Sequence, residues 1–405
     1  MPLGATDTFV SSAGRLKRAA MLACGLAVLA GPLAGCAGTM DTVTGSTGLF
    51  SSAQAAQART VQIFVASTRK SNKEGGTGET SRNARFSITS VSIPPGHEPG
   101  AIERPSITPE SRSRHFVVVG ERRIEPESFQ QQVAAQVSGR IGVSRDVLVF
   151  VHGFNTSYDE ARFRLAQIVA DGNFTGVPVL FTWPSRSQLL AYGSDKESAT
   201  ASRDPLDKLL QDLAATPGVG RVHILAHSMG TWLAMESLRQ AGIAGRADLG
   251  GHIGEVMLAA PDIDLDVFRA QMARVGNVAR VSVFAAADDR ALSVSATLAG
   301  SRTRLGALDL DNKKHLDELL GLNVRVYDLK GTGSSDLLRH GTFAEAPTVV
   351  KTIGAQLAEA PKVTEGAGAQ QAQSFIDPTV DAARKAAPPA PENTEPVEAR
   401  PLAPL

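Results

Sequence analysis

Residues 221–230 read Arg-Val-His-Ile-Leu-Ala-His-Ser-Met-Gly and are the most informative stretch of the chain. An apolar strand ends here in a turn that holds Ser228, and a helical sequence follows from Thr231. This strand–turn–helix pattern is typical of a nucleophilic serine at the top of an α/β sheet. Small residues must flank the serine because strand and helix approach closely, and Ala226 and Gly230 meet that requirement, although glycine usually occupies both positions. The alternative is an ordinary helix start with Ser228 in its first turn.

The composition fits a globular enzyme and does not favour nucleic-acid binding. The 405 residues carry 41 basic and 41 acidic side chains, and aromatic residues make up only 5%. The chain therefore has no global basic field, and no basic stripe with interleaved aromatic residues occurs. There is no glycine-rich dinucleotide motif, no Walker loop and no His-Glu-x-x-His metal motif. We expect no cofactor, no metal and no nucleic-acid partner.

The N-terminal segment resembles a bacterial lipoprotein signal peptide. Basic residues between 15 and 18 precede the apolar stretch 19–33, which is shorter than the about 20 residues of a transmembrane helix. Leu-Ala-Gly-Cys at 33–36 resembles a lipobox. The resemblance implies that residues 1–35 are a signal peptide and that Cys36 becomes a lipid-bearing (for example palmitoylated) N-terminus. A free cysteine at the end of an ordinary signal sequence is the alternative.

The rest of the chain divides by composition. Residues 36–58 are rich in small and polar residues and predict a flexible tether, whereas 359–405, rich in Pro and Ala, predict a disordered tail. Residues 59–358 form the expected folded domain. Because Ala and not Asp follows Cys36, we expect attachment to the outer membrane, facing the periplasm. Oligomeric state is left open.

Inside the domain, apolar runs alternate with helical patterns such as 158–171 and 205–215. This alternation predicts an α/β class with a doubly wound, mostly parallel sheet. Period-two alternation in 86–93 favours an antiparallel edge that pairs with 115–119. The stretch between the strands 254–259 and 280–285 has room for one helix, 264–275, and for no large cap domain. The other strands are expected at 61–66, 146–151, 177–183, 221–226 and 323–329.

A nucleophilic Ser228 requires a base and an acid, each after a later strand. His340 is the only histidine after the last predicted strand, so its position favours it as the base. For the acid we favour Asp289, at the end of the strand 280–285. Asp288 next to it remains an alternative, as does the stretch Pro261-Asp262-Ile263-Asp264 after the preceding strand, with Asp264 as its candidate. The non-catalytic interpretation of these aspartates is that they cap helices.

An oxyanion site is expected where a tight turn follows the strand 146–151. The sequence His152-Gly153-Phe154 suits a close approach of the backbone to the substrate. We expect the backbone N–H groups of Phe154 and Met229 to bind the oxyanion. His152 and His227 are interpreted as structural. Residues 185–203, with Trp183 and Tyr192, are the candidate rim of an otherwise open site.

Several motifs together make the chain similar to a bacterial family of α/β hydrolases known as domain of unknown function 900. The similarity extends over about residues 60–345 and implies an α/β-hydrolase fold with Ser228, Asp289 and His340 as the catalytic triad. The stretches that carry it are Phe-Val-Ala-Ser-Thr-Arg at 64–69, Val-Ser-Ile-Pro-Pro-Gly-His at 91–97, Val-Phe-Val-His-Gly-Phe-Asn at 149–155, Phe-Thr-Trp-Pro-Ser at 181–185, Ala-His-Ser-Met-Gly at 226–230, Ala-Ala-Pro-Asp at 259–262 and Asp-Arg-Ala-Leu at 289–292.

The sequence alone leaves three functions open. The first is a serine esterase or lipase-like hydrolase that cleaves an acyl ester through an acyl-enzyme on Ser228. The second is an acyltransferase that gives the same acyl group to an alcohol or amine. The third is a non-catalytic envelope lipoprotein that serves as a scaffold, and the presence of all triad candidates argues against it.

Overall fold

The structure is a computed structural model that describes residues 58–70, 79–186, 188, 191–298, 300–332, 339–359 and 373–374. The predicted signal peptide 1–35, Cys36, almost all of the tether and most of the predicted tail lie outside the described residues. No helix within the described part has the length and apolarity needed to cross a membrane.

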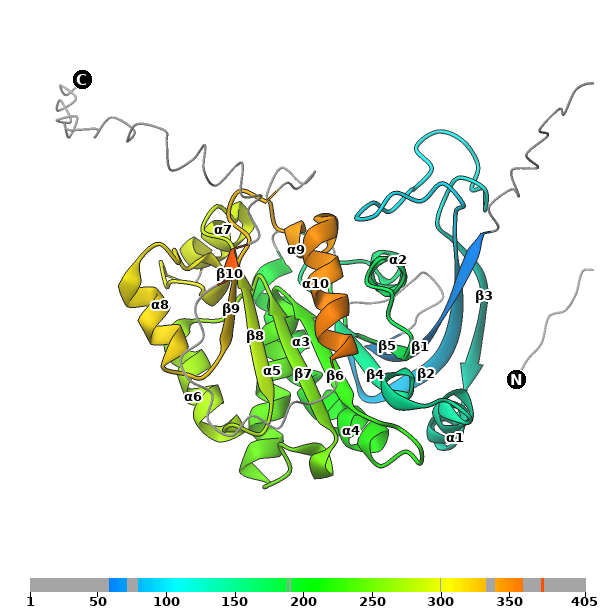
Figure 1. The fold of residues 1–405 in the computed structure, drawn as a ribbon, viewed down its shortest axis with the longest axis horizontal. Helices are drawn as coiled ribbons and strands as arrows, with labels where there is room; N and C mark the ends of the chain where they lie inside the picture. The colour runs from blue at the N-terminus through cyan, green and yellow to red at the C-terminus, as the bar shows by residue number, and fades with distance from the viewer. Residues whose placement is uncertain are drawn as a thin grey trace, which may run out of the picture. The chain divides into compact units, whose positions relative to one another are not determined.

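A sheet of ten strands runs through the described residues in the order β10-β9-β8-β7-β6-β4-β5-β1-β2-β3 (Figure 1). All pairings from β10 to β1 are parallel, whereas β1–β2 and β2–β3 are antiparallel. The strands are β1 (Arg59–Arg69), β2 (Thr80–Ile93), β3 (Val117–Ile124), β4 (Val147–Val151), β5 (Val177–Thr182), β6 (Val222–His227), β7 (Ile253–Ala259), β8 (Arg280–Ala285), β9 (Arg325–Asp328) and β10 (Gln373–Ser374).

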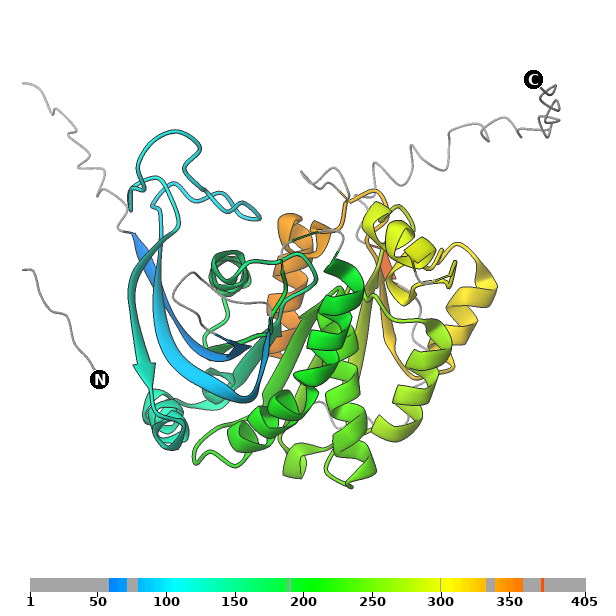
Figure 2. The ribbon, with the colours of Figure 1, turned by 180° about the vertical axis from the view of Figure 1, so that it is seen from behind.

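Helices cover both faces of this sheet. α2 and α10 lie on the face that Figure 1 turns to the viewer, and α4 and α5 lie on the opposite face, seen in Figure 2. The helices are α1 (Pro126–Val137), α2 (Tyr158–Asp171), α3 (Tyr192–Ala201), α4 (Arg203–Ala214), α5 (Met229–Ile243), α6 (Leu265–Val275), α7 (Arg290–Leu298), α8 (Lys313–Leu320), α9 (Thr342–Glu345) and α10 (Pro347–Ala358).

The central strands are buried on both faces, which is why they read as continuous apolar runs. In β4, Val147 and Val149 pack into one hydrophobic cluster with α4 and α5. Leu148 and Phe150 point the other way, into a second cluster with α2 and α10. The period-two geometry of a strand thus divides one apolar run between two cores.

The predicted fold class is confirmed: the chain folds into a doubly wound, mostly parallel α/β-hydrolase sheet without a large cap, and α6 alone lies between β7 and β8. β3 is longer than predicted, because its second half, Gly-Glu-Arg-Arg-Ile at 120–124, is polar and mostly exposed on the sheet edge and carries no apolar pattern. β10 falls within the tail that the sequence predicts to be disordered.

Candidate active site

Ser228 lies at the turn between β6 and α5 with φ 53° and ψ −124°, a left-handed conformation that is uncommon for serine. Hydrogen bonds on both sides fix this strained backbone. The Ser228 N–H donates to Ala259 O at 2.9 Å, and the Ser228 carbonyl accepts from the Thr231 N–H at 3.0 Å and from the Asp262 N–H at 3.3 Å. This backbone conformation places the Ser228 side chain at the carboxyl edge of the sheet, where the sequence predicts a nucleophile.

Two glycines allow the β4 turn to pack directly on this elbow. A Cβ atom on Gly153 would lie 2.8 Å from Ser228 Cβ and 2.9 Å from His227 Nδ1. A Cβ atom on Gly230 would overlap the carbonyl oxygens of Val151 and His152. The small residue that the elbow motif demands at position 230 is thus explained by one contact, with the end of β4.

His340 and Asp289 form a close pair. His340 Nδ1 lies 2.7 Å from Asp289 Oδ2, and the Asp289 side chain is 1% exposed. The other carboxylate oxygen accepts the Leu292 N–H at 3.0 Å, which fixes the carboxylate at the start of α7. Because a carboxylate accepts the Nδ1 proton, Nε2 of a neutral His340 is left as the basic nitrogen.

The other acids that the sequence offered have different partners. Asp288 binds the Arg339 guanidinium at 2.6 Å and accepts the Gly331 N–H. Asp264 caps α6 and pairs with Arg302 at 3.3 Å. Among the described acids, only Asp289 contacts the His340 ring.

His152 fixes the turn that was expected to supply an oxyanion donor. Its Nε2 accepts from the Trp183 N–H and from Arg69, each at 3.3 Å, so the proton lies on Nδ1 and is donated to Gly153 O at 2.9 Å. Burial, with the positive charge of Arg69, lowers the pKa of His152 to about 3, so the ring is neutral. It is a structural residue and not a base.

This hydrogen bond also orients the next backbone N–H. In a trans peptide the carbonyl and the N–H point in opposite directions, so holding Gly153 O against His152 turns the Phe154 N–H away from that ring. The Met229 N–H is the first of α5 and has no acceptor within its helix. In the described part of the chain, neither N–H donates a hydrogen bond. Of the two residues, Phe154 lines the cavity next to Ser228, and Met229 is buried.

His227 supports the backbone of His340. Its Nε2–H donates to the His340 carbonyl at 3.1 Å, and its ring stacks on Phe343 at 4.5 Å. Burial and the nearby His340 lower the pKa of His227 well below its usual value. The ring therefore stays neutral and holds the loop that carries His340.

Several of these groups line one cavity of about 670 Å³, to which Ser228, His340 and Phe154 contribute. One wall is apolar and includes Leu292, Val294 and Leu298 of α7. A second wall, formed by the loop 94–116, α2 and α9, carries charged side chains, namely Arg104, Glu160, Arg164 and Glu345. The cavity is therefore amphipathic, with Ser228 among its lining residues.

The candidate rim is partly correct. Tyr192 lines the cavity, and its hydroxyl donates to Asp262 at 2.8 Å. Asp262 also accepts from Ser295 at 2.6 Å and pairs with Arg304 at 3.1 Å, which ties α3 to α7. Trp183, in contrast, is not part of the rim. Its side chain is fully buried in the core, where it stacks on His152 and donates its indole N–H to His152 O. The sequence analysis missed this network around Asp262.

Comparison with protein families identifies the fold. The model of a family described as alpha/beta hydrolase of unknown function (DUF900) matches residues 125–358, more than half of the chain. The chain belongs to this family. A search of curated proteins finds no match.

Solved structures similar to this α/β hydrolase include a predicted CIB-like hydrolase from Thermoplasma acidophilum, with 16% identity and a TM-score of 0.33 over 53% of this chain and 87% of that one. An esterase from Pyrobaculum calidifontis has 13% identity and a TM-score of 0.32 over 74% and 84%. A fungal esterase of Rhizomucor miehei has 12% identity and a TM-score of 0.32 over 74% and 83%.

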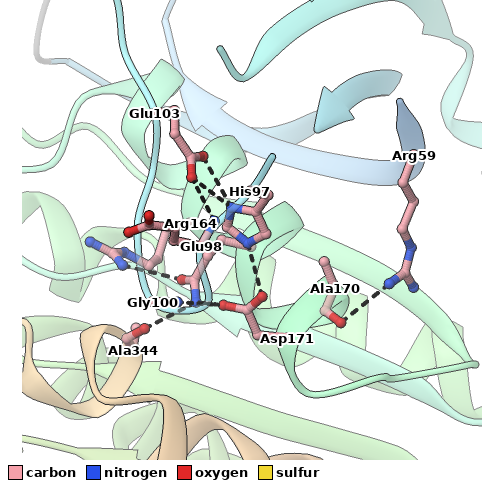
Figure 3. Close-up of polar contacts among 10 residues, drawn as sticks. Arg59, His97, Glu98, Gly100, Glu103, Arg164, Ala170, Asp171 and Ala344 are labelled. Carbon is pink, nitrogen blue, oxygen red and sulfur yellow. Dashed lines mark hydrogen bonds and ion pairs between the residues drawn. The ribbon is translucent and has the colours of Figure 1, made fainter. Parts of the chain in front are cut away.

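A further cluster lies beside the cavity of this α/β hydrolase, where the loop 94–116 between β2 and β3 meets α2 (Figure 3). His97 contacts two carboxylates: Nδ1 lies 3.0 Å from Glu103 and Nε2 lies 2.9 Å from Asp171. Asp171 also accepts the Gly100 N–H at 2.7 Å and Gln167 Nε2 at 2.6 Å. We call His97, Glu103 and Asp171 the loop clamp. Only a protonated imidazole donates to both carboxylates at once.

Desolvation by burial lowers the pKa of His97, but the hydrogen bonds and charges of Asp171 and Glu103 outweigh it, so the net pKa is raised. His97 ends the motif Val-Ser-Ile-Pro-Pro-Gly-His at 91–97, but the motif itself gives no sign of the clamp, whose other two residues lie elsewhere in the chain. Across the described residues, no group of three or more His, Cys, Asp or Glu side chains is arranged to hold a metal ion.

The loop clamp makes stability depend on pH. Since the folded pKa of His97 is raised, the clamp contributes its full stabilisation below the unfolded pKa of about 6.5 and loses it as pH rises through the folded pKa. His97→Gln should therefore lower the free energy of unfolding more at pH 5.5 than at pH 9. Denaturant unfolding of both proteins at the two pH values measures this, and an equal loss at both would contradict a charged clamp.

Proposed function

We propose that this chain is a serine hydrolase that cleaves an acyl ester through an acyl-enzyme on Ser228. The observation that carries the proposal is that Ser228, with its left-handed backbone, lines the same cavity as His340, whose ring is paired with Asp289. Membership of an α/β-hydrolase family supports it. A structural serine gains nothing from a strained backbone, whereas a nucleophile gains exposure to substrate.

Each residue has a defined role in this mechanism. Ser228 Oγ attacks the acyl carbonyl while His340 Nε2 takes the hydroxyl proton, and Asp289 stabilises the imidazolium that forms. The N–H groups of Phe154 and Met229 bind the oxyanion. His340 then returns the proton to the leaving alcohol, and a water molecule activated by the same ring hydrolyses the acyl-enzyme.

The acyl chain is expected along α7. Val294 and Leu298 line the cavity one helical turn apart, yet they are 57% and 62% exposed. Exposed apolar side chains at a cavity wall are stabilised when an apolar ligand covers them. The α7 wall from Ala291 to Leu298 is about 10 Å long at 1.5 Å per residue, which suits an acyl chain of medium length.

A fluorophosphonate probe tests the nucleophile, because it reacts with an activated serine. The wild type should be labelled and should hydrolyse p-nitrophenyl octanoate faster than the acetate. Ser228→Ala should abolish both labelling and hydrolysis, whereas Ser113→Ala, an exposed serine of the loop 94–116, should change neither. Absence of Ser228-dependent labelling would reject the nucleophile and favour the non-catalytic scaffold.

Paired aspartate variants test the acid. Asp289→Asn presents an amide to His340 Nδ1 and favours the wrong tautomer, so kcat should fall about ten-thousand-fold. Asp288→Asn removes the neighbouring carboxylate, which binds Arg339 and not the imidazole, and kcat should stay within a few-fold of wild type. Steady-state kinetics on one ester decides, and the reverse order of effects would move the acid to Asp288.

We further propose that the hydrolase is anchored by lipid on Cys36 to the outer membrane of a bacterial envelope and faces the periplasm. The Leu-Ala-Gly-Cys motif at 33–36 supports this proposal. Two acyl chains or more on one cysteine hold a protein stably on a membrane, which places the reaction next to lipid.

Labelled palmitate tests the anchor in cells that express the full chain. Cys36→Ser should lose the label and leave the membrane fraction, whereas Cys24→Ser, the matched control in the same segment, should keep both. Label that persists in Cys36→Ser would refute lipidation at this position.

A further inference from the structure

The loop 94–116 forms a fixed wall of the Ser228 cavity. It contributes Ile102 and Arg104 to the lining. The loop clamp ties its first half to the end of α2 (Figure 3), and the Phe116 N–H donates to Glu103 O at 2.9 Å at its far end. Gly100, at φ 92°, packs so closely on Glu345 that a Cβ atom there would overlap the Glu345 carbonyl. Such contacts hold the wall in place before a ligand binds.

Arg104 is the cation of this wall that has no acidic partner among the described residues. Its guanidinium carbon lies 4.6 Å from the centre of the Phe163 ring, and no described carboxylate lies within ion-pair distance. Stacking on an aromatic ring leaves the N–H edge of a guanidinium free to donate. Arg104 is also exposed, so a ligand in the cavity has access to it.

The other charges of the wall are already used by the chain. Arg164 lies 3.7 Å from Glu345 and donates to Gln167 at 3.1 Å. Glu160 accepts the Ser157 N–H at 2.7 Å as part of the capping box of α2. Arg164, Glu345 and Glu160 thus each have a polar partner within the chain, whereas the Arg104 guanidinium contacts the Phe163 ring.

The loop wall packs on the segment that carries His340. Glu345 ends α9, the short helix that follows His340, and Gly100 of the loop packs on it. His340 gives its proton to the leaving alcohol, so that part of the ester must lie near the His340 segment. The apolar α7 wall then remains for the acyl chain.

We propose that Arg104 is a specificity-determining residue that binds an anionic group, a phosphate or a carboxylate, on the alcohol part of the ester. This inference rests on the proposed serine hydrolase. Guanidinium binds both anions through paired, charge-assisted N–H···O hydrogen bonds. The substrate class is thus an amphiphilic ester with an apolar acyl chain and an anionic alcohol.

Substrates matched in their acyl chain test the proposal. The full chain is assayed on octanoylglycerol, octanoylglycerol phosphate and octanoylglycerate, which differ only in the charge and geometry of the alcohol part. Arg104→Gln should lower kcat/KM for an anionic ester about tenfold, mainly through KM, and leave the neutral ester unchanged, as expected for one lost charge-assisted contact. The phosphate and carboxylate arms show which anion is preferred.

Two further variants separate specificity from structure. Arg104→Lys keeps the charge and should restore part of the preference for the anionic ester. Arg112→Gln removes the same charge from an exposed position of the same loop that does not line the cavity, and it should change nothing. An equal loss on neutral and anionic esters in Arg104→Gln, or no loss on either, overturns the proposal.

Failure of the inference and failure of the proposed function give different results. If Ser228 is not a nucleophile, the wild type hydrolyses none of the three esters and does not react with fluorophosphonate. If only the inference fails, the wild type hydrolyses the esters and reacts with the probe, but Arg104→Gln leaves its preference among them unchanged.

Discussion

The site depends on one close approach, that of the end of β4 to the elbow after β6. Gly153 lies against Ser228, and Gly230 lies against the carbonyls that end β4. The two strands are neighbours in the sheet, so the parallel register brings both turns to one edge. The left-handed Ser228 persists because this packing and its own hydrogen bonds over-determine it. Without the contact, Ser228 and Phe154 would not line the same cavity.

The environment separates three similar histidines around this contact. His152 is buried and His227 is partly buried, and the pKa values of both are lowered, so both stay neutral and donate to backbone carbonyls. All three histidines line the cavity, but only His340 has a carboxylate, that of Asp289, on its Nδ1. Position after a strand made His340 the candidate base, but only the structure gives the physical reason why its two neighbours are unsuited to proton transfer.

The sequence predicted the features that local chemistry determines. Apolar runs located the parallel strands, and the elbow motif located Ser228, because strand burial and turn sterics act over a few residues. The loop clamp and the network of Asp262 with Tyr192, Ser295 and Arg304 were not predicted. Their partners are brought together by the tertiary fold from distant segments. The prediction that Trp183 lies at the rim was wrong for the same reason, because its partner His152 comes from another strand end.

The two charged networks beside the cavity are better explained by the geometry that they impose on its walls than by a gain in the stability of the fold. A buried ion pair loses hydration on both partners, so apolar residues of similar size often stabilise a protein as well or better. Asp262 and Arg304 are each 2% exposed and fix Tyr192 beside α7, on the apolar wall. The loop clamp fixes the second wall, which carries Arg104. Directional polar contacts of this kind hold each wall in one geometry, and apolar packing alone specifies geometry less strictly. A preorganised cavity loses less conformational entropy of its own when a ligand binds, which gives the charged networks on both walls a role in binding.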